Sequence, residues 1–197
     1  DDLDDLFGGG DLVAAGDIVA CSGPFDSATD NACFTPGGIL DGIRLMNSVP
    51  TNDMIVVGDA ALGNPTALAG PNTFADQHDI TFYDGGVNAV GFDLWAPLGA
   101  ATFAVYIYGL EDVLLGQTTV AASTTGTFWG VYSEDPITRI RTESGSGGEL
   151  FDDIAFGIGG DVPWLTADPV SGTLSAGTAQ IIDVEFDAGA PKVGQPG

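Results

Sequence analysis

Short apolar segments separated by glycine and proline recur along most of the chain and restrict its fold. They are expected as strands at residues 42–48, 53–58, 78–83, 88–95, 101–109, 112–121, 126–132, 136–143 and 149–156. The 30 glycines and 11 prolines supply turn signals between them, and no long amphipathic helical period is present. Regular short strands with turns are typical of sandwiches and barrels. The sequence therefore predicts an all-β protein.

The segment 102–108 alternates cleanly between two faces. Phe103, Val105 and Ile107 are predicted to point inward, whereas Tyr106 and Tyr108 point outward. Sugar rings stack on exposed aromatic rings through their apolar faces. The candidate ligand-binding residues are therefore Tyr106, Tyr108, Trp129 and Trp95. In the alternative interpretation, the N-terminal leader, the second module or another subunit covers the same tyrosines.

The strand at 149–156 contains two adjacent carboxylates in an apolar run, with Leu150, Ile154 and Phe156 predicted on one side. Neighbouring carboxylates require solvent, a hydrogen-bond donor or a cation. Oxygen ligands suit Ca²⁺, and a structural Ca²⁺ is predicted here. The candidate metal ligands are Asp152, Asp153, Asp26 and Asp30. Alternatively, Asp153 faces water and Asp152 accepts hydrogen bonds from the backbone or from Arg139.

The chain has two cysteines, Cys21 and Cys33, and one histidine, His78. Metal or catalytic cysteines would require histidine partners, so the pair is predicted to form a disulfide. Closing this short loop would stabilise the fold by about 3 kcal/mol and favours export to an oxidising compartment. His78 is expected at the surface or as a capping residue.

The charge and the residue types exclude several functions. With 28 acidic and four basic residues, the net charge of −24 disfavours nucleic acid and anionic membranes as partners. No apolar run reaches the length of about eighteen residues needed to span a membrane. A single histidine, with neither a nucleophile elbow nor a phosphate loop, indicates that the protein is not an enzyme. Arg139 and Arg141 are each expected to pair with a carboxylate.

The ordered succession of strands resembles a known kind of module. The residues that carry the likeness are Ala89–Leu94, the tyrosine strand, Leu115–Thr119, Thr127–Val131, Pro136–Ile140 and Phe151–Gly157. Together they look like a jelly-roll module of bacterial secreted and surface proteins, similar in outline to carbohydrate-binding modules. This resemblance implies an exported jelly-roll β-sandwich, often with a structural Ca²⁺ near the Asp-Asp strand. It does not imply one ligand.

The segment 162–187 resembles the first half of a bacterial immunoglobulin-like repeat. Such a repeat needs about seven strands, and two or three are present. The predicted organisation is a leader or N-terminal strand at 1–20, a jelly-roll sandwich at 21–158, and a partial immunoglobulin-like module or assembly segment at 159–197. Either the natural chain continues, or the half-module packs on the first domain, or neighbouring chains complete it.

Two functions follow from these predictions. The first is an extracellular structural or adhesive subunit of a cell-surface or matrix assembly, stabilised by Ca²⁺ and self-associating, with the apolar segment in residues 1–20 serving as a donor strand. If that segment instead forms a strand in its own domain, strand exchange loses its basis. The second is a carbohydrate-binding module of a secreted protein, with a glycan as partner.

Overall fold

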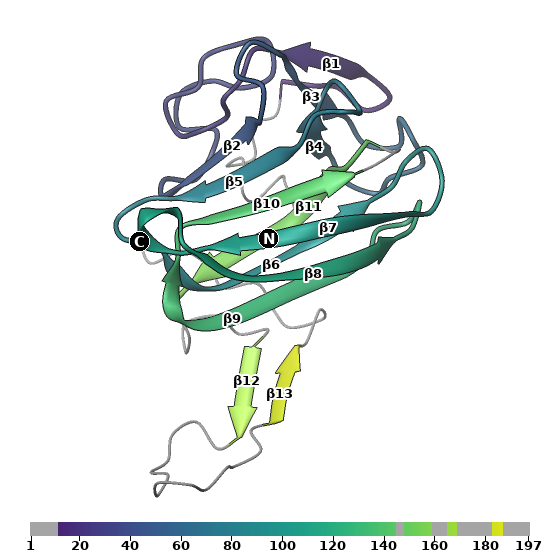
Figure 1. Cartoon of the computed structure of the whole chain (residues 1–197). Helices are drawn as coiled ribbons and strands as arrows, with labels where there is room; N and C mark the ends of the chain where they lie inside the picture. Colours follow the sequence, from purple (N-terminus) through teal and green to yellow (C-terminus); the bar gives the residue numbers. More distant parts are fainter. Residues whose placement is uncertain (1–11, 145–147, 159–164, 169–182, 187–197) are drawn as a thin grey trace, which may run out of the picture.

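The computed structural model describes residues 12–144, 148–158, 165–168 and 183–186. Two antiparallel sheets enclose a common core and form a jelly-roll β-sandwich (Figure 1). The six-stranded sheet has the order β1 (Ile18–Cys21), β3 (Met54–Val57), β4 (Leu68–Pro71), β11 (Leu150–Gly157), β6 (Val87–Trp95), β9 (Phe128–Ile137). The five-stranded sheet has the order β2 (Ile43–Asn47), β5 (His78–Phe82), β10 (Arg139–Ser144), β7 (Ala101–Tyr108), β8 (Leu114–Ala122). The predicted all-β class is confirmed.

The core lies between the two sheets and is rich in aromatic side chains. Phe103 comes from the five-stranded sheet, whereas Phe92 and Phe151 come from the six-stranded sheet, and all three are fully buried. The rings of Phe92 and Phe151 meet edge to face with centroids 5.2 Å apart. On β7, Phe103, Val105 and Ile107 are buried, as the alternation predicts. This burial orients β7 so that its other face points away from the core.

One strand is absent from the predictions. The sequence does not reveal β4, because its four residues, Leu-Ala-Gly-Pro, are all buried and show no alternation. Glycine and proline also disfavour strand assignment. The strand predicted in the N-terminal segment is present as β1, which pairs with β3 inside the sandwich, Ile18 facing Val57 and Cys21 facing Met54. This strand therefore belongs to the sandwich itself. Residues 1–11 lie outside the described residues.

The Asp-Asp strand, β11, lies in the middle of the six-stranded sheet between β4 and β6. Its register with β6 shifts between Asp152 and Ala155, and Asp153 has a φ of 50°. This irregularity corrects the predicted alternation. Leu150 joins an outer cluster with Trp95, whereas Phe151, Ile154 and Phe156 belong to or pack against the core. An extra residue in a strand reverses the direction of all side chains beyond it.

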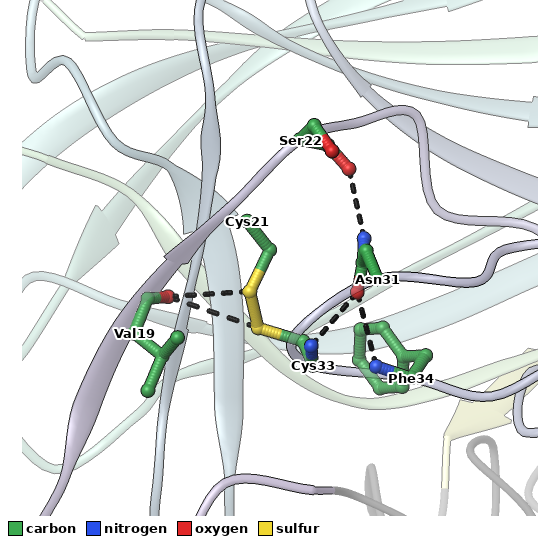
Figure 2. The surroundings of a disulfide bond; sticks show 6 residues. All are labelled: Val19, Cys21, Ser22, Asn31, Cys33 and Phe34. Carbon is green, nitrogen blue, oxygen red and sulfur yellow. Dashed lines mark hydrogen bonds between the residues drawn. A yellow bond between two sulfur atoms is a disulfide. The ribbon is translucent and has the colours of Figure 1, made fainter.

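The disulfide between Cys21 and Cys33 is present and confirms the prediction (Figure 2). Both cysteines are buried, and their Cα atoms are 6.1 Å apart. Asn31 fixes the enclosed loop: its Nδ2 donates to the Ser22 carbonyl at 2.8 Å, and its Oδ1 accepts from the backbone N–H groups of Cys33 and Phe34 at 2.8 and 3.0 Å. The loop is therefore held by polar contacts as well as by the covalent link.

His78 is not a surface or capping residue but lies fully buried in the core region. Its ring stacks on Phe151 with centroids 4.5 Å apart. Burial lowers the pKa of His78 from 6.5 to about 3, although the Asp79 carboxylate acts in the opposite direction. The prediction failed although a strand was expected at 78–83, because the polar character of His78 and its neighbours outweighed the alternation that places it with Ile80 and Phe82.

A separate two-stranded sheet follows the sandwich in sequence. Its strands, β12 (Leu165–Asp168) and β13 (Asp183–Phe186), are antiparallel, with Leu165 facing Phe186. The rest of the predicted immunoglobulin-like segment at 159–197 lies outside the described residues, so that interpretation stays a prediction. Within the described ranges, no helix has the length and apolar character required to cross a bilayer.

Candidate functional site

The outer face of the five-stranded sheet gathers aromatic and charged side chains. Across the register, Tyr106 on β7 faces Arg141 on β10, and Arg141 faces Asp79 on β5. On the other side of β7, Tyr106 faces Gln117 of β8. Opposed residues in antiparallel strands present their side chains on the same face. We call this set, together with Tyr108, Arg139 and Asp112, the tyrosine–arginine face.

The two tyrosines lie side by side on this face. Their ring centroids are 6.5 Å apart with an interplanar angle of 27°, and both side chains are half-buried. The Cζ atom of Arg139 lies 3.8 Å from the centroid of the Tyr108 ring. This cation–π contact covers one side of Tyr108, so the two rings differ in the surface that they can offer.

The carboxylate of Asp79 binds both Arg139 and Arg141. Arg141 donates from Nε to Oδ1 at 2.7 Å and from Nη2 to Oδ2 at 2.6 Å, and Arg139 donates from Nη1 to Oδ1 at 3.1 Å. Asp79 is buried, which by itself would raise its pKa, but the hydrogen bonds and charges of the two arginines outweigh burial and lower that pKa. The expectation that Arg139 and Arg141 each pair with a carboxylate is confirmed. The shared carboxylate therefore fixes the positions of both guanidinium groups.

A tight turn borders this face where β7 joins β8. It contains the short 3₁₀ element η1 (Leu110–Asp112), in which Glu111 and Asp112 have φ values of 55° and 62°. Asp112 accepts hydrogen bonds from Arg139 Nη2 at 2.6 Å and Nε at 3.1 Å. Consecutive left-handed conformations are unfavourable for residues other than glycine. The ion pair with Arg139 therefore contributes to holding this strained turn against the sheet.

Arg44 extends the same pattern to β2. It faces Thr81 of β5, which in turn faces Arg139. Arg44 Nη2 donates to Asp26 Oδ2 at 2.9 Å. Three of the four basic residues of a chain with net charge −24 thus share one sheet face, each bound to a carboxylate. Their positive charges are locally compensated.

The two tryptophans do not join the tyrosines, which corrects the predicted group. Trp129 lies on β9 of the other sheet, with its ring centroid 5.0 Å from that of Phe92. Trp95 is buried in an outer cluster of the same sheet with Val57, Leu68 and Leu150. Strand alternation assigns a residue to one side of a strand, but it does not say which sheet the strand enters.

The predicted metal ligands lie in two separate places. Asp26 and Asp30 belong to the Cys21–Cys33 loop, and Asp26 is bound to Arg44. Asp152 accepts hydrogen bonds from the hydroxyl of Thr66 and, at 2.8 Å, from the backbone N–H of Asp153. Asp152 therefore bonds to Thr66 and to the backbone, whereas Arg139 binds Asp79 and Asp112.

A third carboxylate lies beside the Asp-Asp pair. Asp93 of β6 faces Asp152 in the register, and burial, with a smaller contribution from Asp153, raises the pKa of Asp93. Nevertheless, the described part of the chain shows no group of three histidine, cysteine, aspartate or glutamate side chains that could hold a metal ion. A structural Ca²⁺ at Asp152 and Asp153 stays a prediction.

Sequence reasoning missed the polar part of the tyrosine–arginine face. Asp79, Asp112 and Gln117 belong to it but were not singled out. A signal was present for one of them: Asp79 and Thr81 alternate with the buried Ile80 and Phe82, as expected for outward positions on a half-buried strand. The sequence does not reveal that β5 pairs with β10, and it is this pairing that brings Asp79 to the arginines.

The chain is similar to known proteins in structure but not in sequence. No family model and no curated protein match the chain. Among solved structures, a family 29 carbohydrate-binding module is 13% identical over 74% of this chain and 96% of its own, with a TM-score of 0.39. A family 11 carbohydrate-binding module from Clostridium thermocellum, in complex with a mixed-linked tetrasaccharide, is 10% identical over 71% and 96%, with a TM-score of 0.37.

A third similar structure is TmCBM61 in complex with β-1,4-galactotriose. It is 13% identical over 58% of this chain and 86% of its own, with a TM-score of 0.39. At such identities, residues that bind ligand cannot be transferred from one chain to the other. The function must therefore be inferred from the tyrosine–arginine face itself.

Proposed function

We propose that this protein is a non-catalytic module that binds a glycan on the tyrosine–arginine face. The observation that carries the proposal is the pairing of two outward tyrosine rings, 6.5 Å apart, with fixed arginine and aspartate side chains on the neighbouring strands. Apolar rings with a few placed polar groups are the usual composition of a small-molecule site. A sugar chain presents both kinds of surface, because its C–H faces are apolar and its hydroxyl groups are polar.

Tyr106 provides the principal stacking surface. The guanidinium of Arg139 covers one side of the Tyr108 ring, and no such contact is recorded for Tyr106 among the described residues. A C–H face of a sugar on Tyr106 gains both buried apolar area and contact with the aromatic ring. Tyr108 adds a second contact beside it, so consecutive sugar units can be held along β7.

The polar groups around the rings set the orientation of the ligand. Gln117 is exposed beside Tyr106, and its amide can both donate to and accept from hydroxyl groups. Arg141 uses Nε and Nη2 for Asp79, and its remaining nitrogen, Nη1, can donate outward. Because Asp79 already holds the guanidinium, little side-chain entropy is lost when the ligand binds.

The setting of this module is proposed to be extracellular. The Cys21–Cys33 disulfide favours an oxidising compartment, where polysaccharides are also found. The assembly function predicted from the sequence has weaker support. It relies on strand exchange by the N-terminal segment, but Ile18–Cys21 already pairs with β3 in the same chain, and residues 1–11 lie outside the described residues.

The proposal is tested by calorimetric titration of the whole chain with a panel of soluble polysaccharides and oligosaccharides. Tyr106→Ala should weaken binding to the best ligand at least about tenfold, as expected for a central aromatic contact. The matched control is Tyr132→Ala, because Tyr132 is an exposed tyrosine on β9 of the other sheet. Full affinity in Tyr106→Ala, or an equal loss in both variants, would contradict the proposal.

A further inference from the structure

The strand β8 forms one edge of the five-stranded sheet, and β7 is its only neighbour among the described strands of that sheet. It lies in a stretch, residues 113–133, that contains neither a charged residue nor a proline, although 28 of the 197 residues of the chain are acidic. Charged residues and proline are common devices that keep an edge strand from pairing with another chain. The strand β8 therefore lacks a protection that its position calls for.

Hydrogen bonds at the end of β7 show which way its backbone points. The carbonyl of Tyr108 accepts from the N–H of Thr138, which precedes β10, whereas the N–H of Gly109 donates to the carbonyl of Val113, which precedes β8. Because the two directions alternate along a strand, even-numbered residues of β7 bond to β10 and odd-numbered residues bond to β8.

This alternation fixes the direction of the backbone groups in β8. Ile107 faces Gly116 and Val105 faces Thr118, so Gly116 and Thr118 direct their N–H and C=O groups toward β7. The intervening residues direct theirs away from the sheet. The exposed residues with outward backbone groups are Gln117, Thr119 and Ala121.

The other edge strands of the described sandwich are protected. The strand β9 carries Glu134, Asp135 and Pro136. On β2, Leu45 exchanges two backbone hydrogen bonds with Phe25 of the disulfide loop, at 2.8 and 2.9 Å. The strand β1 has only four residues. Of these edges, β8 is therefore the one best suited to pair with a further strand.

We infer that β8 pairs antiparallel with β8 of a second copy of this chain, about a two-fold axis at Thr119. Two molecules of net charge −24 repel each other, so a contact between copies requires a surface without carboxylates, which residues 113–133 supply. The threonines at position 119 of the two copies face each other, and Gln117 faces Ala121 of the other copy. Each of these pairs exchanges two backbone hydrogen bonds, and opposed threonines are favourable.

Two exposed apolar side chains at the start of β8 support this pairing. Val113 and Leu114 are 57% and 49% exposed. In the register centred on Thr119, Leu114 lies opposite Thr124 of the other copy, in the turn that follows β8. Burial of these side chains adds a hydrophobic contribution to the backbone hydrogen bonds, whose net contribution is modest.

Pairing joins the two five-stranded sheets into one continuous sheet, with both tyrosine–arginine faces on the same side. A two-fold pair closes on itself, so it differs from the filament predicted from the N-terminal segment. With the glycan binding proposed above, two sites could act on one polysaccharide and gain avidity. The pairing itself does not depend on that function.

Analytical ultracentrifugation of the full chain without glycan tests the inference, so its outcome is separate from that of the glycan titrations. Thr119→Asp places two carboxylates opposite each other, and Thr119→Pro removes an outward N–H, a change that an edge strand tolerates. The matched control is Thr51→Asp, which adds the same charge at an exposed position beside β2, the opposite edge of the sheet. Thermal unfolding verifies that each variant is folded.

The unaltered chain should form a species of twice 20.0 kDa, and added NaCl should strengthen its association because salt screens the repulsion between copies. Thr119→Asp and Thr119→Pro should weaken association at least about tenfold, whereas Thr51→Asp should not. The inference is overturned if the unaltered chain stays monomeric up to about 1 mM, where weak interfaces still form, or if Thr119→Asp associates as strongly as Thr51→Asp.

Cross-linking tests the register. Oxidised Thr119→Cys should give a covalent dimer on a non-reducing gel, because residues at the two-fold axis lie about 5.5 Å apart between Cα atoms, within the range of a disulfide. Thr51→Cys should not cross-link, and Ala121→Cys should cross-link far less than Thr119→Cys because it faces Gln117. Equal cross-linking at the three positions would indicate random collision and would overturn the proposed pairing.

Discussion

The guanidinium of Arg139 lies 3.8 Å above the ring of Tyr108 and binds Asp79 and Asp112 at the same time. One side chain thus joins an aromatic residue, a buried carboxylate and a strained turn. Because the arginine is already fully engaged, its removal should affect several parts of the face together. This arrangement makes the two tyrosines experimentally distinguishable, even though they are two residues apart on one strand.

Tyr106→Ala is expected to reduce glycan affinity more than Tyr108→Ala. The reason is that Arg139 covers one side of the Tyr108 ring, which leaves less of that ring for a sugar. A difference of about 1 kcal/mol, equivalent to roughly fivefold in Kd, is of the size expected for an aromatic contact. Calorimetric titration of both variants with the same oligosaccharide measures it. A larger loss for Tyr108→Ala would contradict the assigned roles.

Asp79→Asn should destabilise the fold by about 3 kcal/mol, because it leaves two largely buried guanidinium groups without their shared carboxylate. Asp112→Asn is the control: this carboxylate is 67% exposed, so its loss should cost less than about 1 kcal/mol. Urea unfolding at neutral pH gives both free energies. Equal effects would show that burial of Asp79 is not the deciding factor.

Protonation of His78 opposes folding as the pH falls from 7 to 5, whereas protonation of Glu149, whose pKa burial raises to about 8, favours the folded state over the same range. The pKa of His78 is about 3 in the folded state and 6.5 in the unfolded state, so the unfolded state binds more protons at this residue between these values. The contribution of His78 to stability is therefore fully present above about pH 6.5 and is lost as the pH decreases. The expected loss from His78 alone between pH 7 and pH 5 is about 2 kcal/mol.

His78→Phe removes the titrating group and keeps an aromatic ring against Phe151. The difference in unfolding free energy between the variant and the unaltered protein should change by about 2 kcal/mol between pH 7 and pH 5, in favour of the variant at the lower pH, which denaturant unfolding can measure. If the two proteins show the same dependence on pH, His78 is not the titrating group.

Loss of the disulfide should lower stability by about 3 kcal/mol, because a 12-residue separation closes a short loop in the unfolded chain. The double variant Cys21→Ala with Cys33→Ala tests this by denaturant unfolding. A reducing agent should destabilise the unaltered protein and leave the double variant unchanged. If the reducing agent affects both alike, the disulfide is not the source of the stability.

The local sequence pattern was sufficient to predict most strands, but it did not predict which strands pair with each other. Alternation on β7 correctly separated Phe103, Val105 and Ile107 from the two tyrosines. It could not place Trp95 and Trp129 on the opposite sheet, since sheet membership depends on contacts between residues distant in sequence. On β5, alternation separates His78, Ile80 and Phe82 from Asp79 and Thr81. Only the pairing of β5 with β10 brings Asp79 to the arginines and identifies it as their anchor.

The irregularity at Asp153 changes the parity of β11. Before it, odd-numbered residues such as Glu149 and Phe151 face inward; after it, even-numbered residues such as Ile154 and Phe156 do so. Glu149, Phe151, Ile154 and Phe156 therefore face the same interior, although no uninterrupted alternation of this sequence would place all four on one side. Asp152 and Asp153 lie at the position where the alternation of the strand shifts by one residue. Their side chains therefore stay out of the core, while the residues before and after them point into it.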